Sequence, residues 1–204
     1  MASRAPVPGG AADELPADGL RQRRRAHTRA AACDVALRLF AERGYAEVTV
    51  ADICTAAEIA PRTFFRYFTS KADVLAEPAR DLSARTAEYL AAAPEQLSDA
   101  DALVSALRQL GGHVVADAGR LRLFLGLART SSDVRSDLSV HLSHQERGLV
   151  DQLVRRHPAP EAPDWQTRLL VARTVAAFRV WLDDFVTGAV ADPLGHLDEV
   201  LAAR

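Results

Sequence analysis

Apolar residues recur at helical spacing in every long segment of this 204-residue chain. No segment shows the alternation of apolar and polar residues, bounded by turn residues, that is typical of β-strands. Cys33, Ala36, Leu37 and Phe40 are the clearest example, because they fall at i, i+3, i+4 and i+7 and so share one side of a helix. The chain is therefore expected to be all-α, with about nine helices.

Capping residues divide the N-terminal part of the chain into short helices. The first helix is expected to begin at about Arg24 and to end before Gly44, which lies in the C′ position where a left-handed backbone is favoured. Thr49 followed by Asp52 matches a capping box and predicts a second helix over residues 50–57.

Two further start signals follow closely along the chain. Pro61 suits the first turn of a helix over residues 61–68, because its missing N–H needs no partner there. Ser70 followed by Asp73 is another capping-box pair and predicts a fourth helix over residues 71–92.

The remaining segments are assigned in the same way. Residues 1–19 are rich in Ala, Pro, Gly and Asp and are expected to form a disordered tail. The later helices are expected at about 98–117, 120–129, 133–156, 164–187 and 193–203.

The nearly balanced composition hides an uneven distribution of charge. The whole chain has 25 Lys and Arg against 27 Asp and Glu, a formal net charge of −2. Residues 20–71 hold ten basic and five acidic residues, a net charge of +5, whereas residues 72–204 hold fourteen and nineteen, a net charge of −5. This asymmetry indicates a polyanion as the partner of one end of the molecule, although the charge of solvated faces also varies by chance.

Composition also bears on the compartment. Cys33 and Cys54 are the only cysteines, and both lie in helical patterns, so we expect reduced core residues in a cytoplasmic protein. No apolar run approaches the ~18–20 residues that cross a bilayer. The start of the chain also lacks the basic and apolar regions of a signal peptide. No membrane partner is expected.

The segment of residues 49–68 has the spacing of a helix-turn-helix, in which the second helix enters the major groove of DNA. On a helical wheel Phe64 and Phe68 form one apolar side of this second helix, and Arg62 and Arg66 lie opposite them. Arginine at such a position donates two hydrogen bonds to guanine O6 and N7. The helix is therefore predicted to have one buried edge and one edge that contacts DNA.

Flanking residues fit the same geometry. Thr63 lies beside the two arginines, where its hydroxyl and methyl groups can meet a base or a phosphate. Thr49 and Lys71, the only lysine of the chain, begin helices whose N-termini attract phosphate. Arg24 and Arg25 belong to a basic arm, from Arg21 to Arg25, that either reaches into the minor groove or is a solvated linker.

Residues 24–76 resemble the DNA-binding domain of the TetR family of bacterial transcriptional repressors. The matching runs are ALRLFAERGY, VTVADI, RTFFRYF and SK, over residues 36–45, 48–53, 62–68 and 70–71. The resemblance implies a DNA-binding domain over residues 20–70 and a ligand-binding and dimerisation domain over residues 71–204. It also implies a homodimer that binds a palindromic operator in double-stranded DNA and is released by a small-molecule effector.

Three positions depart from the family pattern. Glu58 stands where the family usually has glycine in the turn, which is costly if φ is positive there. Phe65 replaces a phosphate-contacting tyrosine and is expected to make only apolar contacts, while Tyr67 replaces a histidine and is expected to supply a phosphate hydrogen bond. The complete set expected at the DNA is Arg24, Arg25, Thr49, Arg62, Thr63, Phe65, Arg66, Tyr67 and Lys71.

The resemblance places the dimer interface on the last two helices. Within the helix over residues 164–187, a stripe at helical spacing includes small residues that allow close packing, although the same stripe could pack against its own body. These residues are Leu169, Ala172, Ala176 and Val180. No sequence signal identifies the residues that bind an effector.

The alternative is a helical enzyme or metal-binding protein with an incidental basic segment. His141 and His144 share a helix face and could bind a metal together with Glu146, but no third ligand can be named from the sequence. The sequence has no nucleophile elbow, Walker A or dinucleotide-binding motif. We therefore expect no catalytic site, metal or cofactor. A DNA-binding protein without any effector remains a third interpretation.

Overall fold

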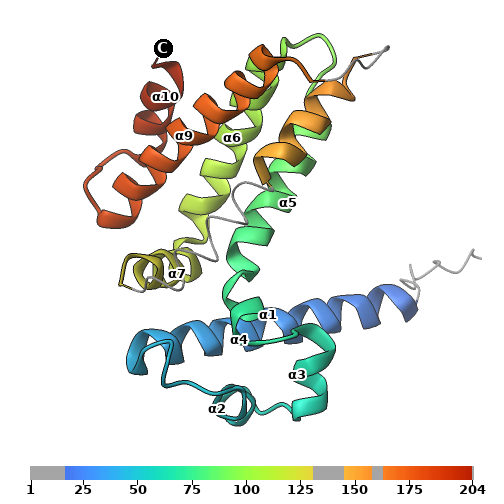
Figure 1. Ribbon diagram of the computed structural model, residues 1–204, viewed down its shortest axis with the longest axis vertical. Helices are drawn as coiled ribbons and strands as arrows, with labels where there is room; N and C mark the ends of the chain where they lie inside the picture. The colour runs from blue at the N-terminus through green and yellow to red at the C-terminus, as the bar shows by residue number, and fades with distance from the viewer. Residues whose placement is uncertain (1–16, 131–144, 158–162, 204) are drawn as a thin grey trace, which may run out of the picture.

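The computed structural model describes residues 17–130, 145–157 and 163–203, and all regular structure in these ranges is helical (Figure 1). Residues 145–154 form a further helical segment that carries no label in the figures. The labelled helices are α1 (Ala17–Arg43), α2 (Val50–Ala56), α3 (Pro61–Tyr67), α4 (Lys71–Leu75), α5 (Glu77–Ala91), α6 (Asp99–Ala116), α7 (Ala118–Thr130), α9 (Trp165–Thr187) and α10 (Pro193–Ala202).

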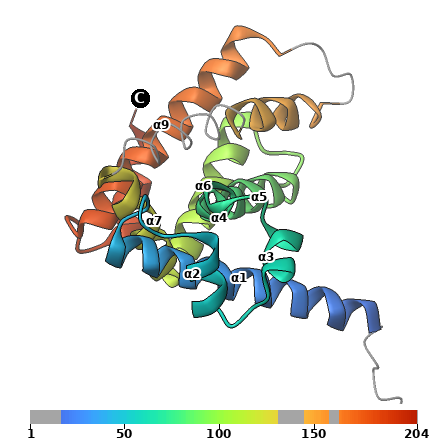
Figure 2. The same ribbon diagram turned by 60° about the horizontal axis from the view of Figure 1, so that its bottom comes forward.

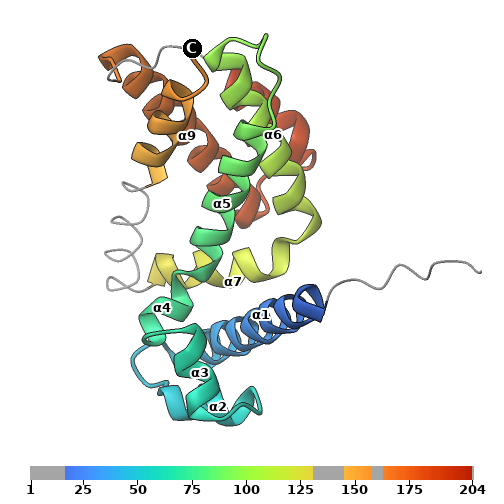
Figure 3. The ribbon, with the colours of Figure 1, turned by 90° about the vertical axis from the view of Figure 1, so that its right-hand side faces the viewer.

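The helices form an N-terminal domain of α1–α4 and a larger body that contains the remaining helices (Figures 1 and 3). In Figure 3, α7 lies at the base of the body and runs beside α1, while α2 and α3 form the far end of the N-terminal domain. Across the described helices, none is long and apolar enough to cross a membrane.

The predicted packing face of α1 is confirmed, but its start is earlier than expected. Cys33, Ala36, Leu37 and Phe40 are completely buried. Because α1 begins at Ala17, Arg24 and Arg25 lie within the helix, and the prediction of a basic arm before it is wrong. Arg, Gln and Ala are good helix formers, so the basic stretch continues the helix. Residues 1–16 of the expected tail lie outside the described residues.

The single helix expected over residues 71–92 is also wrong, since Ala76 separates α4 from α5. Pro78 explains the break, because it has no N–H to donate to the carbonyl of Val74 and its ring would crowd that carbonyl. The Val74 carbonyl instead accepts a hydrogen bond from the Cys33 thiol of α1, at a sulfur–oxygen distance of 3.7 Å. The carbonyl left free by the interruption therefore connects α4 to α1.

One hydrophobic core extends from the N-terminal domain into the body. It contains Phe40 and Phe64 of the first domain together with Leu110, Phe124 and Trp181 of the body. A second cluster, which includes Leu90, Leu103 and Leu153, occupies the end of the body away from α1. The two domains therefore share buried apolar contacts, and movement of α7 or α5 has to be accommodated by the helices of the first domain.

Candidate nucleic-acid interface

The helix-turn-helix begins with a complete capping box at Thr49. The N–H of Asp52 donates to the Thr49 hydroxyl, and the Thr49 N–H donates to the Asp52 carboxylate, at 3.1 and 2.9 Å. The Thr49 hydroxyl also donates to this carboxylate at 2.5 Å, and these hydrogen bonds lower the pKa of the Asp52 carboxyl below its ordinary value. The expected cap is confirmed. A phosphate at Thr49 would have to share the Thr49 N–H and hydroxyl with the Asp52 carboxylate, or displace it.

In the turn between α2 and α3, Glu58 adopts the left-handed backbone conformation that glycine favours. Its φ is +53°, and among the described residues other than glycine it is alone in having a positive φ. The Ile59 N–H donates to the carbonyl of Cys54 at 3.0 Å and closes the end of α2. The chain thus accepts a left-handed residue that costs about 1 kcal/mol to hold the two helices at their angle.

The two edges predicted for α3 are confirmed. Phe64 and Phe68 are buried, with ring centroids 5.4 Å apart. Arg62 and Arg66 are exposed, and Phe65 is 58% exposed with its ring edge-on to that of Phe64. Thr63 and Tyr67 are half-buried on the flanks. The apolar edge fixes α3 to its domain, and α3 lies with α2 at the end of the molecule that comes forward in Figure 2.

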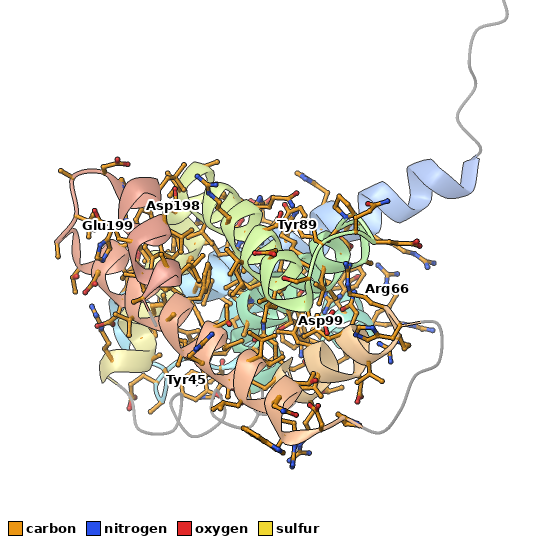
Figure 4. The ribbon with its side chains drawn as sticks, turned by 90° about the horizontal axis from the view of Figure 1, so that it is seen from above. Tyr45, Arg66, Tyr89, Asp99, Asp198 and Glu199 are labelled. Carbon is orange, nitrogen blue, oxygen red and sulfur yellow. The ribbon has the colours of Figure 1, made fainter. Side chains whose placement is uncertain are left out.

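Arg66 and Tyr67 form a local pair on this edge. The Arg66 guanidinium donates to the Tyr67 hydroxyl at 2.9 Å and lies over the ring at 4.8 Å from its centroid. In Figure 4, Arg66 lies on the opposite side of the molecule from Asp198 and Glu199 of α10. The guanidinium keeps donors for DNA, but it is held against the aromatic flank of α3.

Lys71 has protein partners at the position where a phosphate was expected. Its ammonium group donates to the carbonyls of Tyr45, Ala46 and Val48, at 2.8, 3.1 and 3.1 Å, and lies 4.5 Å from the Tyr45 ring centroid. These three hydrogen bonds match the three donors of an ammonium group. They fix the turn between α1 and α2, and contact between Lys71 and DNA stays a prediction.

Two sets of ion pairs connect α1 to the body. The Arg29 guanidinium stacks on Phe68 at 5.6 Å and donates to Glu77 of α5 at 2.6 Å. Further along α1, Asp34 accepts two hydrogen bonds from Arg120 of α7. The first set links the anchor of α3 to α5, and the second links α1 to α7. Neither pair was predicted, because its members are far apart in the sequence.

The body contains a mainly apolar cavity of about 200 Å³. It lies among α5, α6, α7, α9 and the start of the helical segment over residues 145–154. Its lining includes Leu121 and Phe124 of α7 and Ala79 and Leu82 of α5. The two helices that the ion pairs connect to α1 therefore also form walls of the cavity.

The stripe predicted for dimerisation lies on an open face of α9. Leu169 and Val180 are 57% and 56% exposed, and Ala172 and Ala176 between them are also exposed. Trp165, one turn before Leu169, is 63% exposed and extends the stripe. Among the described residues, this stripe is therefore not packed against its own body, and its use for dimerisation stays a prediction.

Only Glu146 of the alternative metal site lies within the described residues. His141 and His144 lie outside the described residues. Glu146 forms an ion pair with Arg179 at 2.7 Å. Within the described ranges, no cluster of three or more His, Cys, Asp or Glu side chains is arranged to hold a metal ion.

These features define the class as a helix-turn-helix protein whose helical body contains a mainly apolar cavity. Residues 33–77 match the family model described as bacterial regulatory proteins, tetR family. The HTH-type transcriptional regulator TcmR of Streptomyces glaucescens is 40% identical over 104 residues, which are 51% of this chain and 43% of that regulator. The match thus spans less than half the length of this curated relative.

Solved structures extend the likeness to the whole fold. The fatty acid degradation regulator FadR from Bacillus halodurans has a TM-score of 0.61, with 20% identity over 85% of this chain and 92% of that chain. SmeT in complex with triclosan has a TM-score of 0.60, with 19% identity over 86% of this chain and 90% of that chain. Residues 33–77 are therefore similar to the TetR family of bacterial regulatory proteins, and the solved structures share the fold of this chain.

Proposed function

We propose that this protein is a sequence-specific, DNA-binding transcriptional repressor of the bacterial cytoplasm, released from its operator by a small molecule. The observation that carries the proposal is the cationic edge of α3. Arg62 and Arg66 project from a short helix whose opposite edge, Phe64 and Phe68, is fixed in the core. Rigid presentation of arginine matches recognition of guanine in the major groove.

A homodimer follows from the small size of this surface. One seven-residue helix contacts only a few base pairs, which is too few to select a site in a genome. The exposed stripe of α9, from Trp165 to Val180, is the surface that we propose for the partner, since monomers seldom leave a contiguous apolar face open. Two chains related by a two-fold axis would bind two half-sites of a palindrome.

Release by a ligand is supported by the position of the cavity. Ligand in the cavity contacts α5 and α7, and these helices hold α1 through Glu77 and Arg120. An effector that binds better to a conformation with shifted α1 changes the placement of α3 and weakens DNA binding. The SmeT–triclosan complex, a structure with the same fold, holds a small molecule. Permanent DNA binding without an effector is the second candidate, and it predicts no response to any ligand in the cavity.

The test is to select bound sequences from a random pool of double-stranded DNA with the full-length protein. We expect an inverted repeat whose half-sites lie one helical turn or a multiple apart, bound by two chains. Affinity should fall steeply as salt rises, because neutralised phosphates release counterions. A double variant with Arg62→Ala and Arg66→Ala should enrich no sequence, whereas Arg147→Ala and Arg155→Ala in the body should enrich the same repeat. Failure of the wild-type protein to enrich any sequence would contradict the proposal.

A further inference from the structure

The polar residues that line the cavity restrict the charge of its ligand. All but three of the lining residues are apolar, and the three are Gln145, Arg179 and Asp183. Arg179 donates to Glu146 at 2.7 Å, and Asp183 accepts a hydrogen bond from Arg129. Each charged lining residue is therefore neutralised by a partner of opposite sign.

A charged ligand would gain little from this arrangement. A carboxylate at Arg179 would meet a guanidinium already paired with Glu146, and an ammonium group at Asp183 would meet a carboxylate already paired with Arg129. In either case a charge would leave water for an apolar site without gaining a new counter-charge, which is unfavourable. The balance of charge thus disfavours both a carboxylate and an ammonium group.

Gln145 is the remaining polar lining residue. In the part of the chain that the structure describes, its amide makes no hydrogen bond. An amide both donates and accepts, so it suits a hydroxyl, a carbonyl or another amide on a ligand. This residue lies at the start of its helical segment, whereas the other walls carry leucine and phenylalanine.

The volume restricts the size of the ligand. A cavity of 150 Å³ lined by aliphatic and aromatic residues accommodates benzene. The cavity here, at about 200 Å³, has room for a single ring with a short substituent and a polar group. About ten non-hydrogen atoms therefore fit without movement of the walls.

We propose that the cavity binds an uncharged, mainly apolar molecule of about this size, with one hydrogen-bonding group that meets the amide of Gln145. The inference rests on the proposed function only in treating this molecule as the effector, since its binding is measurable without DNA. A para-substituted ring with one hydroxyl group is the simplest compound of this chemistry.

The test compares three probes that share a para-ethylphenyl group and differ in charge. These are para-ethylbenzyl alcohol, para-ethylbenzoate and para-ethylbenzylamine, measured by calorimetry on the full-length protein at neutral pH. We expect the alcohol to bind at least about tenfold more tightly than either ion, because only the ions lose charge solvation without compensation. A carboxylate or an amine that binds as tightly as the alcohol would overturn the inference.

Two variants place the binding in the cavity. Gln145→Leu should weaken binding of the alcohol by about tenfold and leave para-ethyltoluene, which has no polar group, unaffected or tighter. Gln109→Leu, on the exposed face of α6, is the matched control and should change neither. Leu82→Trp should fill the half-buried wall and abolish binding of both compounds, with folding checked by circular dichroism. Unchanged binding in Leu82→Trp would place the ligand elsewhere and overturn the inference.

DNA binding separates this inference from the proposed function. If the alcohol binds as expected but no DNA sequence is selected, the repressor proposal fails and the ligand class stands. If the operator is bound but a charged probe is preferred, the ligand class fails and the repressor proposal stands.

Discussion

Arg120 and Asp34 lie 86 residues apart in the chain and are joined by two hydrogen bonds, Nε to Oδ1 at 2.6 Å and Nη2 to Oδ2 at 3.1 Å. This fork between α7 and α1 directly precedes Leu121, which lines the cavity. Arg120, which binds Asp34 of the N-terminal domain, is thus the direct chain neighbour of the cavity residue Leu121. We therefore expect a shift of α7 to reach α1 through this pair.

The energetic coupling of this pair should exceed that of an exposed ion pair. The side chains of Arg120 and Asp34 are 26% and 37% exposed, whereas Arg108 and Asp198, which join α6 to α10, are 64% and 42% exposed. A double-mutant cycle with Arg120→Gln and Asp34→Asn, measured by urea unfolding, should give a coupling of about 1–2 kcal/mol. The same cycle on Arg108 and Asp198 should give less than about 0.5 kcal/mol. Equal values would show that the fork adds no rigidity.

Arg62 should determine one base position in each half-site. Arg62→Ala should cost about 1–3 kcal/mol on the selected operator and relax the preference at that position, since a bidentate contact to guanine is lost. Arg147→Ala removes the same charge from the body and should leave the preference intact. The measurement is affinity for the operator, for single-base variants of it and for random DNA. An equal loss on random DNA would make Arg62 a phosphate contact instead.

Phe65 should contact a thymine methyl group, because this large aromatic residue lies beside Arg62 and Arg66 and is 58% exposed. Replacing each operator thymine by uracil removes only the methyl group. At one position per half-site this should weaken binding by about fourfold, the value of one buried methyl group at about 0.8 kcal/mol. Phe65→Ala should abolish the difference between thymine and uracil, and Phe65→Tyr should retain it. A difference that persists in Phe65→Ala would assign the methyl contact to another residue.

Lys71→Met should destabilise the N-terminal domain by about 1–3 kcal/mol, because three carbonyls lose their charged donor. Arg147→Met removes an exposed charge from the body and serves as the control. We expect the slope of log affinity against log salt to change by less than the value of about 1 expected for a lost phosphate contact. Unchanged stability together with a slope reduced by about 1 would instead establish the phosphate contact that the sequence suggests.

Ala176→Arg should convert the protein to monomers in sedimentation experiments. The residue is exposed at the centre of the α9 stripe, so a charge there would be buried without a partner in the proposed dimer. Ala191→Arg, in the exposed turn between α9 and α10, is the control and should leave the dimer intact. A folded Ala176→Arg dimer with normal operator affinity would move the interface to another face.

Local signals in the sequence predicted the short helices well. Thr49, Pro61, Ser70 and Ser98 each begin a helix as expected, because a cap involves residues only three or four apart. Gly44 ends α1 with a positive φ of 88°, as its position indicated. The buried edge of α3 followed from periodicity alone.

Longer-range features were not predictable in this way. Nothing local to Arg120 indicates Asp34 as its partner, and nothing local to Lys71 indicates that three carbonyls from a turn 23–26 residues earlier surround it. The break at Pro78 was missed because the capping pair at Ser70 suggested one continuous helix. A proline eight residues into that helix is the signal that would have located the break. The cavity depends on five helices together, so no single stretch of sequence indicates it.

The hydrogen bond between the Cys33 thiol and the Val74 carbonyl gives the protein an internal reporter of its own opening. Burial raises the pKa of the Cys33 thiol to about 12, so that in the closed protein the sulfur is neither ionised nor accessible at neutral pH. A thiol reagent reacts with Cys33 only in the fraction of molecules in which α1 has separated from α4. The rate of modification at Cys33, followed separately from that at Cys54, therefore measures how often α1 and α4 separate. Comparison of that rate in free, DNA-bound and ligand-bound protein requires no added label on the chain.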